Sequence, residues 1–530
     1  MTYGREKSDG RVVPAKRANA ASHRRPGSQG EPYTGTKGET PDTAKGRPTA
    51  EWTRGGGKAE PVEGRRPAKG NTDRQNATRT QSRIPANNAL DRVHRVAVRQ
   101  KDARFTALLH HVTVDRLREA FLSLKRDAAA GVDGVTWEHY AQELEVKLQD
   151  LHARVHRGAY RAQPSRRVYI PKADGRQRPL GIAALEDKVV QRAVVEVMNA
   201  IYEGDFLGFS YGFRPGRNQH QALDALAVGI LRKKVNWVLD ADIRGYFDTI
   251  DHGWLMKFVE HRIGDRRVLR LIHKWLKAGV MEEGEWRASE VGSPQGATVS
   301  PLLANIYLDY VFDLWIQWWR SRHARGEMIV VRYADDVVIG FQHRSDATRF
   351  RNELDARLSE FGLELHPEKT RLLEFGRYAA GRRAERGVGK PETFDFLGLT
   401  HICGRTRSGE FLLVRRTSRK RMAAKLRWVA DELMRRRHLS IKKQGLWLQR
   451  VVAGYFNYHA IPTNAQALQQ FRKQVTGHWR RALRRRSQQD RTDWQRITRL
   501  ADRWLPKARI QHPWPNDRFD ARTRGGSPVR

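Results

Sequence analysis

Two adjacent aspartates in the turn of a short hairpin constrain this chain more than any other feature. Residues 333–336 read Tyr-Ala-Asp-Asp and lie between two apolar runs, 328–331 and 337–341, a pattern that predicts a tight β-hairpin. Like charges on neighbouring residues repel, and the flanking apolar strands leave little solvent to screen them. A divalent cation would relieve that repulsion. The alternative is an ordinary Asp-rich turn without a ligand.

A second acidic segment precedes the hairpin. In the predicted strand 236–242, the period of two places Asp240 and Asp242 on one face, and Asp242 falls at the strand end. From there its carboxylate can reach a neighbouring hairpin tip. Asp242, Asp335 and Asp336 would together hold two Mg²⁺ ions, the arrangement used to transfer a nucleotidyl group. Asp240 is expected to make a structural pair instead.

Residues that would meet a nucleotide surround these acids in the sequence. Phe247 lies where its ring could crowd the sugar 2′ position and favour deoxyribose, although a core aromatic explains the same pattern. Residues 292–296 form a rigid turn before the apolar helix predicted at 302–306, and Gln295 in that turn is a candidate contact for the nucleotide or template. Asp248 is expected to face solvent.

A cationic hairpin is predicted further upstream, over residues 170–182. It carries Lys172, Arg176 and Arg178, and the planar fork of arginine matches phosphate oxygens. Lys172 and Arg178 are therefore candidate ligands of a triphosphate or of template phosphates. A basic hairpin that is simply solvated is the competing interpretation.

The charge balance indicates a polyanionic partner. The 530 residues include 99 Lys and Arg against 59 Asp and Glu, a formal charge of +40, and such an excess favours nucleic acid. No apolar run approaches the roughly 20 residues that span a bilayer, and the first residues lack the apolar core of a secretion signal. We therefore expect a cytoplasmic protein without a membrane partner.

Cys403 is the single cysteine, which excludes internal disulfides and a Cys-based zinc site.

Composition divides the chain into a polar N-terminal stretch, a mixed body and a basic helical end. Residues 1–86 are rich in Gly, Pro, Ser, Thr and Arg without apolar periodicity and are expected to be disordered. They would be either an RNA-binding arm or sequence upstream of the functional start. Helical spacing is predicted for 87–150, with Thr113 as an N-cap, and strands alternate with helices over 151–402, which indicates an α+β body.

The strand signal ends at Arg415, and residues 415–519 are expected to form a helical domain with several helices over 419–503. A disordered tail is expected at 520–530. One helix gathers its apolar side chains on a single face: Leu468, Phe471, Val475, Trp479 and Leu483. Its other faces carry Arg472, Lys473, Arg480, Arg481, Arg484 and Arg485. With several tryptophans nearby, these cations are candidate RNA contacts, the alternative being a solvated helix face.

Taken together, these motifs resemble the reverse transcriptase and maturase proteins encoded within bacterial group II introns. The similar blocks come in the family's order, at 130–136, 178–181, 210–215, 242–248, 294–296, 333–336, 366–370 and 394–398. Further similarity lies at 454–459, 483–487 and 505–515. The resemblance covers residues 87–519.

The resemblance implies a right-hand polymerase with fingers and palm, followed by an all-α thumb and maturase region called domain X. Asp242, Asp335 and Asp336 are then the catalytic ligands of two Mg²⁺ ions, Phe247 discriminates the sugar and Gln295 contacts the nucleotide. The implied partners are the host group II intron RNA, an RNA template with a DNA primer, dNTPs and a DNA target. No particular oligomeric state is implied.

The expected activity is RNA-directed DNA polymerisation combined with intron splicing and retrohoming in bacteria. Relatives with an HNH endonuclease carry paired cysteines, which this sequence lacks, so it resembles the endonuclease-lacking kind and is expected to prime from a pre-existing 3′ end. Two alternatives stay open. One is a reverse transcriptase domesticated for defence or repair, and the other is an RNA-binding splicing factor without polymerase activity.

Overall fold

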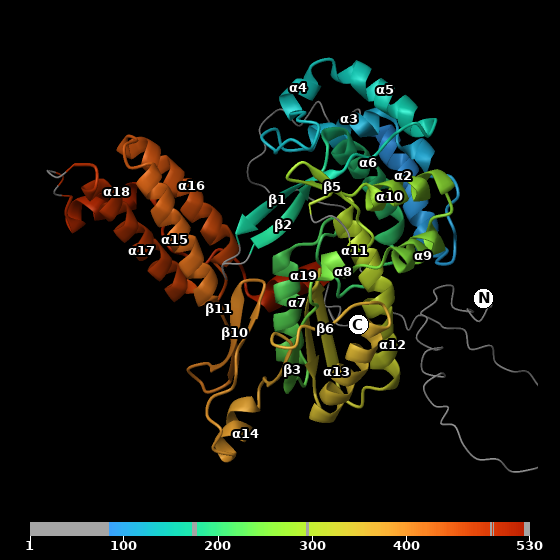
Figure 1. Cartoon of the computed structure of the whole chain (residues 1–530). Coiled ribbons are helices and arrows are strands. Elements are labelled where there is room, and N and C mark those ends of the chain that lie inside the picture. Colours follow the sequence, from blue (N-terminus) through green and yellow to red (C-terminus); the bar gives the residue numbers. More distant parts are fainter. Residues whose placement is uncertain (1–83, 172–176, 293–295, 488–489, 491, 524–530) are drawn as a thin grey trace, which may run out of the picture.

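The computed structural model describes residues 84–171, 177–292, 296–487, 490 and 492–523. An α+β body is followed by a helical region, as predicted (Figure 1). The expected disordered extension lies outside the described residues apart from its last positions, where the first described helix, α2, already begins at Ile84. The last helix, α19, runs to Thr523 and so enters the stretch expected to be a disordered tail.

Helices and a four-stranded sheet form the fingers. The helices are α2 Ile84–Arg99, the 3₁₀ turn η2 Leu109–His111, α3 Val114–Leu122, α4 Trp137–Ala141, α5 Leu144–His156 and α6 Leu185–Tyr202. The strands run in the order β2-β1-β4-β5, with β1 Ser165–Pro171, β2 Gln177–Ile182, β4 Val280–Glu282 and β5 Glu285–Arg287. Thr113 caps α3 as predicted, because its side chain accepts a hydrogen bond from the Arg116 backbone. The expected boundary between residues 150 and 151 falls inside α5, whose apolar face continues across it from Leu148 to Val155.

The palm is an antiparallel sheet that is buried on both faces. Its strand order is β6-β7-β3-β8, formed by β6 Met328–Tyr333, β7 Asp336–Phe341, β3 Trp237–Asp242 and β8 Arg371–Glu374. Val337 and Ile339 of β7 pack into the main core, whereas Val338 packs into a second core with helix α7 Gln219–Arg232. Because successive side chains enter different cores, β6 and β7 each contain a continuous apolar run.

Further helices cover the palm sheet and connect it to the fingers. They are α8 Tyr246–Thr249, α9 His252–Arg262, α10 Arg266–Lys277, α11 Ser300–Leu308, α12 Leu314–Arg322, α13 Arg344–Ser359 and α14 Ala379–Glu385. The apolar helix predicted at 302–306 is α11. It continues into α12 through a π-helical segment, η3 Asp309–Asp313.

A small sheet joins the palm to the helical region. It consists of β9 Phe394–Phe396, β10 Leu399–Arg405 and β11 Phe411–Thr417, in the order β11-β10-β9. The first helix after this sheet begins at Arg419, where the sequence predicted helices to begin, and β11 continues to Thr417, past the last residue with a strand signal in the sequence. Arg415 and Arg416 break the apolar pattern of the strand in the sequence. In the fold, Arg415 is buried and its charge faces Asp224 at 3.7 Å.

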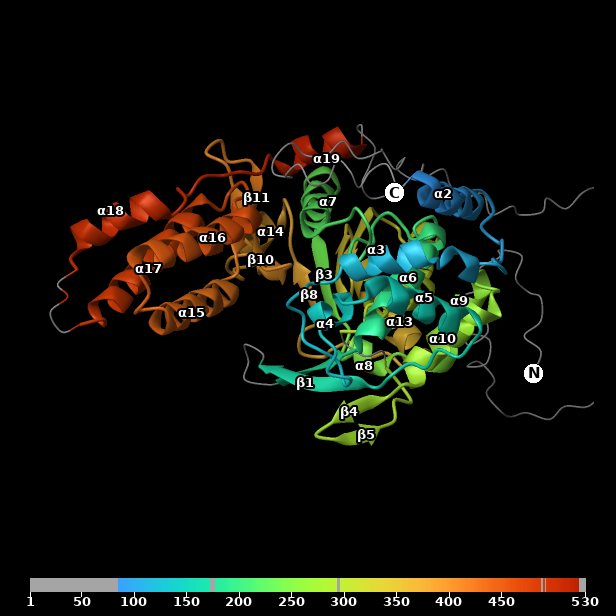
Figure 2. The ribbon, with the colours of Figure 1, turned by 90° about the horizontal axis from the view of Figure 1, so that it is seen from above.

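Four helices make up the helical domain, α15 Arg419–Arg435, α16 Ile441–His459, α17 Ala465–Arg484 and α18 Trp494–Trp504. They stand apart from the fingers and palm in both views (Figures 1 and 2). The predicted apolar face of α17 is confirmed: Leu468, Phe471, Val475, Trp479 and Leu483 are all buried in the core of this domain.

The chain finally returns to the palm. Helix α19 Pro515–Thr523 lies beside α7 (Figure 2). Arg518 Nη2 donates a hydrogen bond of 2.9 Å to Asp224 Oδ1 on α7, and Phe519 is buried in the same core. Among the described helices, none combines the length and apolar character needed to cross a membrane.

Candidate active site

The acidic turn is the tip of the hairpin between β6 and β7. Tyr333 pairs with Asp336 in the strand register, which leaves Ala334 and Asp335 as a two-residue loop. Ala334 has a positive φ of 58°, the conformation that tight hairpin turns require in order to match the twist of their strands. The predicted hairpin is therefore present, and its turn holds a non-glycine residue in an unfavourable backbone conformation.

Strand β3 brings the third acid beside this turn. It runs antiparallel to β7, and Asp242 lies directly opposite Asp336. Directly opposed residues of antiparallel strands have Cα atoms about 4.5–5.5 Å apart. The structure therefore brings together the three aspartates that the sequence analysis selected, at one end of the palm sheet.

Burial and mutual repulsion raise the pKa values of two of the three acids. Partial desolvation, followed by the charges of Asp335 and Asp242, raises the pKa of Asp336 to about 7, although one side of this residue is open to solvent. Burial and the Asp242 charge also raise the pKa of Asp335, and Arg178 opposes this shift. Arg421 of α15 likewise opposes the rise of the Asp336 pKa. Burial and the neighbouring carboxylates thus disfavour the charged forms of these two acids more than the nearby arginines favour them.

A lysine occupies part of the space beside Asp242. Lys369 Nζ lies 2.7 Å from Asp242 Oδ2, and the backbone N–H of His366 donates to the Asp242 carbonyl at 2.8 Å. Within the described ranges, no three acidic, histidine or cysteine side chains converge into a finished metal cluster. The donor chemistry nevertheless fits hard divalent ions, because carboxylate oxygens are the ligands that Mg²⁺ prefers.

Two other acids, Asp240 and Asp248, lie near this site. Asp240 Oδ2 lies 3.6 Å from Arg371 Nη2, which agrees with the expected structural pair, and burial raises the pKa of Asp240 to about 6. Asp248 is exposed on the short helix α8, as expected.

Aromatic rings border the acids on the side of α8. Phe247 is half-buried and packs against the main core, in line with the core interpretation of this residue. Its ring also meets Phe213 edge to face, with centroids 6.5 Å apart, and Phe213 approaches Tyr333 at the same distance. Phe213 is 53% exposed and has a positive φ of 59°. Phe213 belongs to the motif at 210–215 but was not among the residues predicted to form the site.

The cationic hairpin of the fingers is formed by β1 and β2, as predicted, with Ile170 opposite Arg178. Arg178 is exposed and near enough to Asp335 to lower the pKa of that carboxyl, so the structure brings it to the acids. Lys172 and Gln295, the other two candidate nucleotide contacts, lie outside the described residues.

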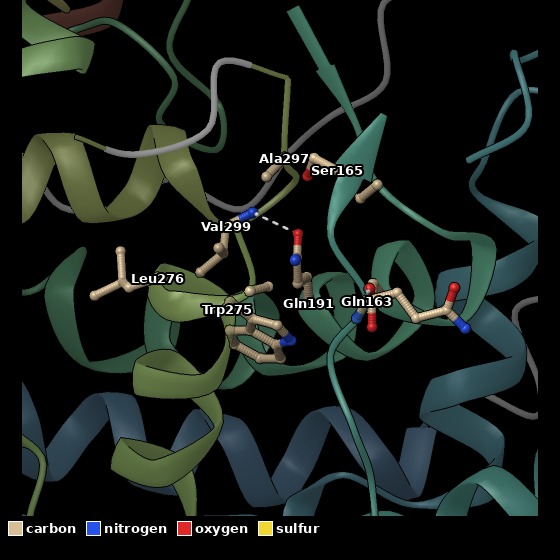
Figure 3. A pocket seen from close by; sticks show the side chains of 10 residues that line it. Gln163, Ser165, Gln191, Trp275, Leu276, Ala297 and Val299 are labelled. Carbon is tan, nitrogen blue, oxygen red and sulfur yellow. Dashed lines mark hydrogen bonds between the residues drawn. The ribbon is translucent and has the colours of Figure 1, made fainter. Parts of the chain in front are cut away.

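A pocket beneath the fingers shows how the loop that follows Gln295 is held (Figure 3). Gln191 of α6 points from below into this loop, and its Oε1 accepts hydrogen bonds from the backbone N–H groups of Thr298 and Val299, at 2.9 and 3.4 Å. Gly296 packs against Gly181 of β2, because a Cβ atom at Gly296 would lie 2.6 Å from the Gly181 carbonyl oxygen. The loop is therefore fixed against both α6 and the cationic hairpin. None of the three acids lines this pocket.

Comparisons with known proteins agree with this geometry. Residues 170–401 match the family described as reverse transcriptase (RNA-dependent DNA polymerase). Protein YkfC of Escherichia coli (strain K12) is 36% identical over 326 residues, which cover 55% of this chain and 81% of that protein. Group II intron-encoded protein LtrA of Lactococcus lactis subsp. cremoris is 35% identical over 221 residues, 41% of this chain and 37% of that protein. The chain belongs to the family of group II intron-encoded reverse transcriptases and maturases.

A third relative of this group II intron family is the uncharacterized 91 kDa protein in the cob intron of Schizosaccharomyces pombe (strain 972 / ATCC 24843). It is 44% identical over 145 residues, which cover 27% of this chain and 18% of that protein. The similarity to LtrA and to this protein thus spans well under half of each of them.

The candidate RNA contacts of this group II intron protein fall into two groups on α17. Lys473, Arg481, Arg484 and Arg485 are exposed. Arg472 instead donates to the Pro506 and Ala501 carbonyls and pairs with Asp502, which ties α17 to the end of α18. Arg480 donates to the Thr492 carbonyl and lies over the Trp494 ring at 4.7 Å.

Several residues around the acids were not predicted from the sequence to belong to the site. Lys369 reaches Asp242 across 127 positions of chain. Gly212 packs against the acidic turn, and Arg332 lies fully buried beneath it. Gly212 and Lys369 belong to the motifs at 210–215 and 366–370, and Arg332 directly precedes the acidic turn in the sequence.

Proposed function

We propose that this protein is an RNA-directed DNA polymerase that also binds its host group II intron RNA and promotes splicing and retrohoming. The pairing of Asp242 with Asp336 beside Asp335 carries the polymerase part of this proposal. Family membership supports the intron-related part. The proposed partners are the intron RNA, a primed RNA template, dNTPs and a DNA target.

The proposed reaction joins the primer 3′ oxygen to the α-phosphorus of a dNTP and releases pyrophosphate. Two Mg²⁺ ions bound by Asp242, Asp335 and Asp336 would lower the pKa of the primer hydroxyl and neutralise charge on the phosphates. Arg178 supplies positive charge from the fingers, opposite Asp335. The half-buried ring of Phe247 is proposed to limit space at the sugar, and Lys172 and Gln295 are proposed to contact the nucleotide.

The helical domain is proposed to bind RNA through its exposed cations. Arg481, Arg484 and Arg485 are exposed at the end of α17, and Lys473 is exposed nearer its middle. Trp494 is 54% exposed and lies beside Arg480 of the same helix. Cations bind RNA phosphates with strong salt dependence, and exposed aromatic rings stack on unpaired bases.

Primer extension tests the polymerase part. Wild-type protein should extend a DNA primer on an RNA template in the presence of Mg²⁺, and Asp335→Asn should abolish extension while RNA affinity stays nearly unchanged. Asp248→Asn removes a nearby exposed acid and is the matched control, which should extend normally. If wild-type protein makes no cDNA at any Mg²⁺ concentration yet still stimulates splicing, the protein is a splicing factor without polymerase activity.

A splicing assay tests the intron-related part. RNA transcribed from the DNA that flanks the gene should splice faster with the protein than without it, and Asp335→Asn should retain this stimulation. If the flanking DNA does not contain a group II intron, the maturase role is wrong and a domesticated reverse transcriptase is the better description.

A further inference from the structure

We infer that Arg332 is a positioning residue that fixes the acidic turn through a buried polar network with Asp313 and Asn305. The inference rests on the proposed polymerase function, because the turn matters here as the element that presents Asp335 and Asp336. It assigns a role to residues outside the set of acids, and it explains how a hairpin tip without glycine keeps an unfavourable backbone conformation.

The guanidinium of Arg332 connects a helix to the turn. Its side chain is fully buried, and Nε donates to Asp313 Oδ1 at 2.7 Å while Nη2 donates to the second carboxylate oxygen. The remaining nitrogen, Nη1, donates to the Ala334 carbonyl at 3.0 Å and to Asn305 Oδ1 at 3.1 Å. Arg332 thus holds the carbonyl of the residue that has a positive φ.

The opposite side of the turn is held by the same network. Asn305 Nδ2 donates to the Gly212 carbonyl at 2.7 Å, and a Cβ atom at Gly212 would lie 2.2 Å from the Ala334 nitrogen. The backbone of Arg332 also pairs with the segment that contains Gly212: its carbonyl accepts a hydrogen bond from the Tyr211 N–H at 2.8 Å, and its N–H donates to the Phe209 carbonyl at 2.9 Å. A non-glycine residue persists in a left-handed conformation where its surroundings over-determine it, and these contacts do so.

The π-helical segment brings the two partners of Arg332 to one face. Asn305 lies on α11 and Asp313 ends η3, eight positions later. In a regular α-helix eight residues turn the side chain by roughly 800°, which leaves the two about 80° apart around the axis. One additional residue in a π-turn brings them to within about 20°. The helix therefore departs from regular geometry where the network needs both side chains.

Geometry, more than stability, explains a buried ion pair at this place. Replacing a buried ion pair by apolar residues is often neutral or stabilising, so the pair is a weak source of stability. A second buried pair in this protein provides the comparison. Arg262 and Asp205 are equally buried, with Nε donating to Oδ2 at 2.9 Å, but Arg262 binds the carbonyls of 97, 100, 101 and 103, far along the chain from the acidic turn.

The experiment compares Asn305→Leu and Asp313→Asn with Asp205→Asn in the full-length protein. Asn305→Leu removes the contacts of the amide without changing a charge, and Asp205→Asn repeats the Asp313 substitution in the comparison pair. Mn²⁺ binding is measured by electron paramagnetic resonance without nucleic acid, next to melting temperature and the kcat and KM of primer extension. We expect Asn305→Leu and Asp313→Asn to weaken Mn²⁺ binding and lower kcat by about tenfold or more, with KM for primer-template unchanged.

Asp205→Asn should lower the melting temperature without altering Mn²⁺ affinity. The inference is overturned if Asn305→Leu folds and binds Mn²⁺ with wild-type affinity, or if Asp205→Asn weakens Mn²⁺ binding as much as Asp313→Asn does. Should Asp313→Asn fail to fold, Asn305→Leu decides the question. Absence of cDNA synthesis by wild-type protein would contradict the proposed function instead, and the Mn²⁺ comparison would still test the positioning role.

Discussion

Gly212 lies so close to the acidic hairpin that one added methyl group would displace it. A Cβ atom at this position would lie 2.2 Å from the Ala334 nitrogen and 2.9 Å from the Tyr333 carbonyl carbon, whereas ordinary contact begins at 3.4 Å. Both obstructing atoms belong to the backbone, so no side-chain rotation can relieve the clash. In Gly212→Ala the turn must move by roughly 1 Å.

The expected loss is large for activity and moderate for stability. A 1 Å misplacement of reacting groups lowers a rate about 100-fold, which corresponds to about 2.7 kcal/mol of transition-state stabilisation. Forcing an extra methyl into a packed site lowers the free energy of unfolding by about 1–3 kcal/mol. Because the exposed cations of α17 lie on a different domain, RNA affinity should stay within about twofold of wild type.

Single-turnover primer extension at saturating primer-template measures the first effect, and thermal melting measures the second. Gly208→Ala is the matched control, because an added Cβ there has no described atom within 4 Å. Gly208→Ala should behave as wild type in both assays. The reasoning is refuted if Gly212→Ala extends primers at the wild-type rate with the wild-type Mg²⁺ dependence.

Three further predictions concern the charges of the site and of the helical domain. Lys369→Gln removes the cation that lies 2.7 Å from Asp242 and should tighten Mn²⁺ binding several-fold in a titration without nucleotide; weaker binding would mean that Lys369 supports the metal ligands. Because the pKa of Asp336 is raised to about 7, a proton competes with the metal below that pH, so Mn²⁺ affinity should fall as pH is lowered from 8 to 6, and Asp336→Asn should flatten this dependence. Changing Lys473, Arg481 and Arg484 to Glu should weaken RNA binding and make it less sensitive to salt, with the slope of log affinity against log salt falling by about 0.7 to 0.9 for each phosphate that is no longer neutralised. Filter binding between low and high salt measures this slope, and an unchanged slope would place the RNA elsewhere.

Local sequence patterns predicted the elements whose determinants are local. The acidic hairpin follows from two apolar runs around a two-residue turn, and the buried face of α17 follows from helical spacing. Asp242 was predicted to lie beside the hairpin because it falls at the end of a strand, from which a carboxylate can reach a neighbouring turn. The last residues of β11 were less evident, because Arg415 and Arg416 interrupt its apolar pattern and the buried charge of Arg415 is compensated by Asp224 on α7.

The network beneath the turn depends on contacts that no local pattern records. Arg332 and Asp313 meet across two elements, and the π-helical segment that aligns Asp313 with Asn305 is continuous with the helices on either side of it. The approach of Lys369 to Asp242 likewise arises from strand β3 lying beside the segment at 366–370. These placements follow from how elements pack, so only the folded structure reveals them.

The return of α19 to α7 has a mechanical consequence. The helical domain begins directly after β11 and ends before α19, and each of these elements is anchored near Asp224, through Arg415 on one side and Arg518 on the other. A force applied to α17 by a bound RNA would therefore reach α7 from both ends of the helical domain, and α7 packs against β6, one of the two strands that carry the acidic hairpin. Tension on RNA bound at the contacts proposed on α17 would thus be passed through α7 toward the hairpin that presents Asp335 and Asp336.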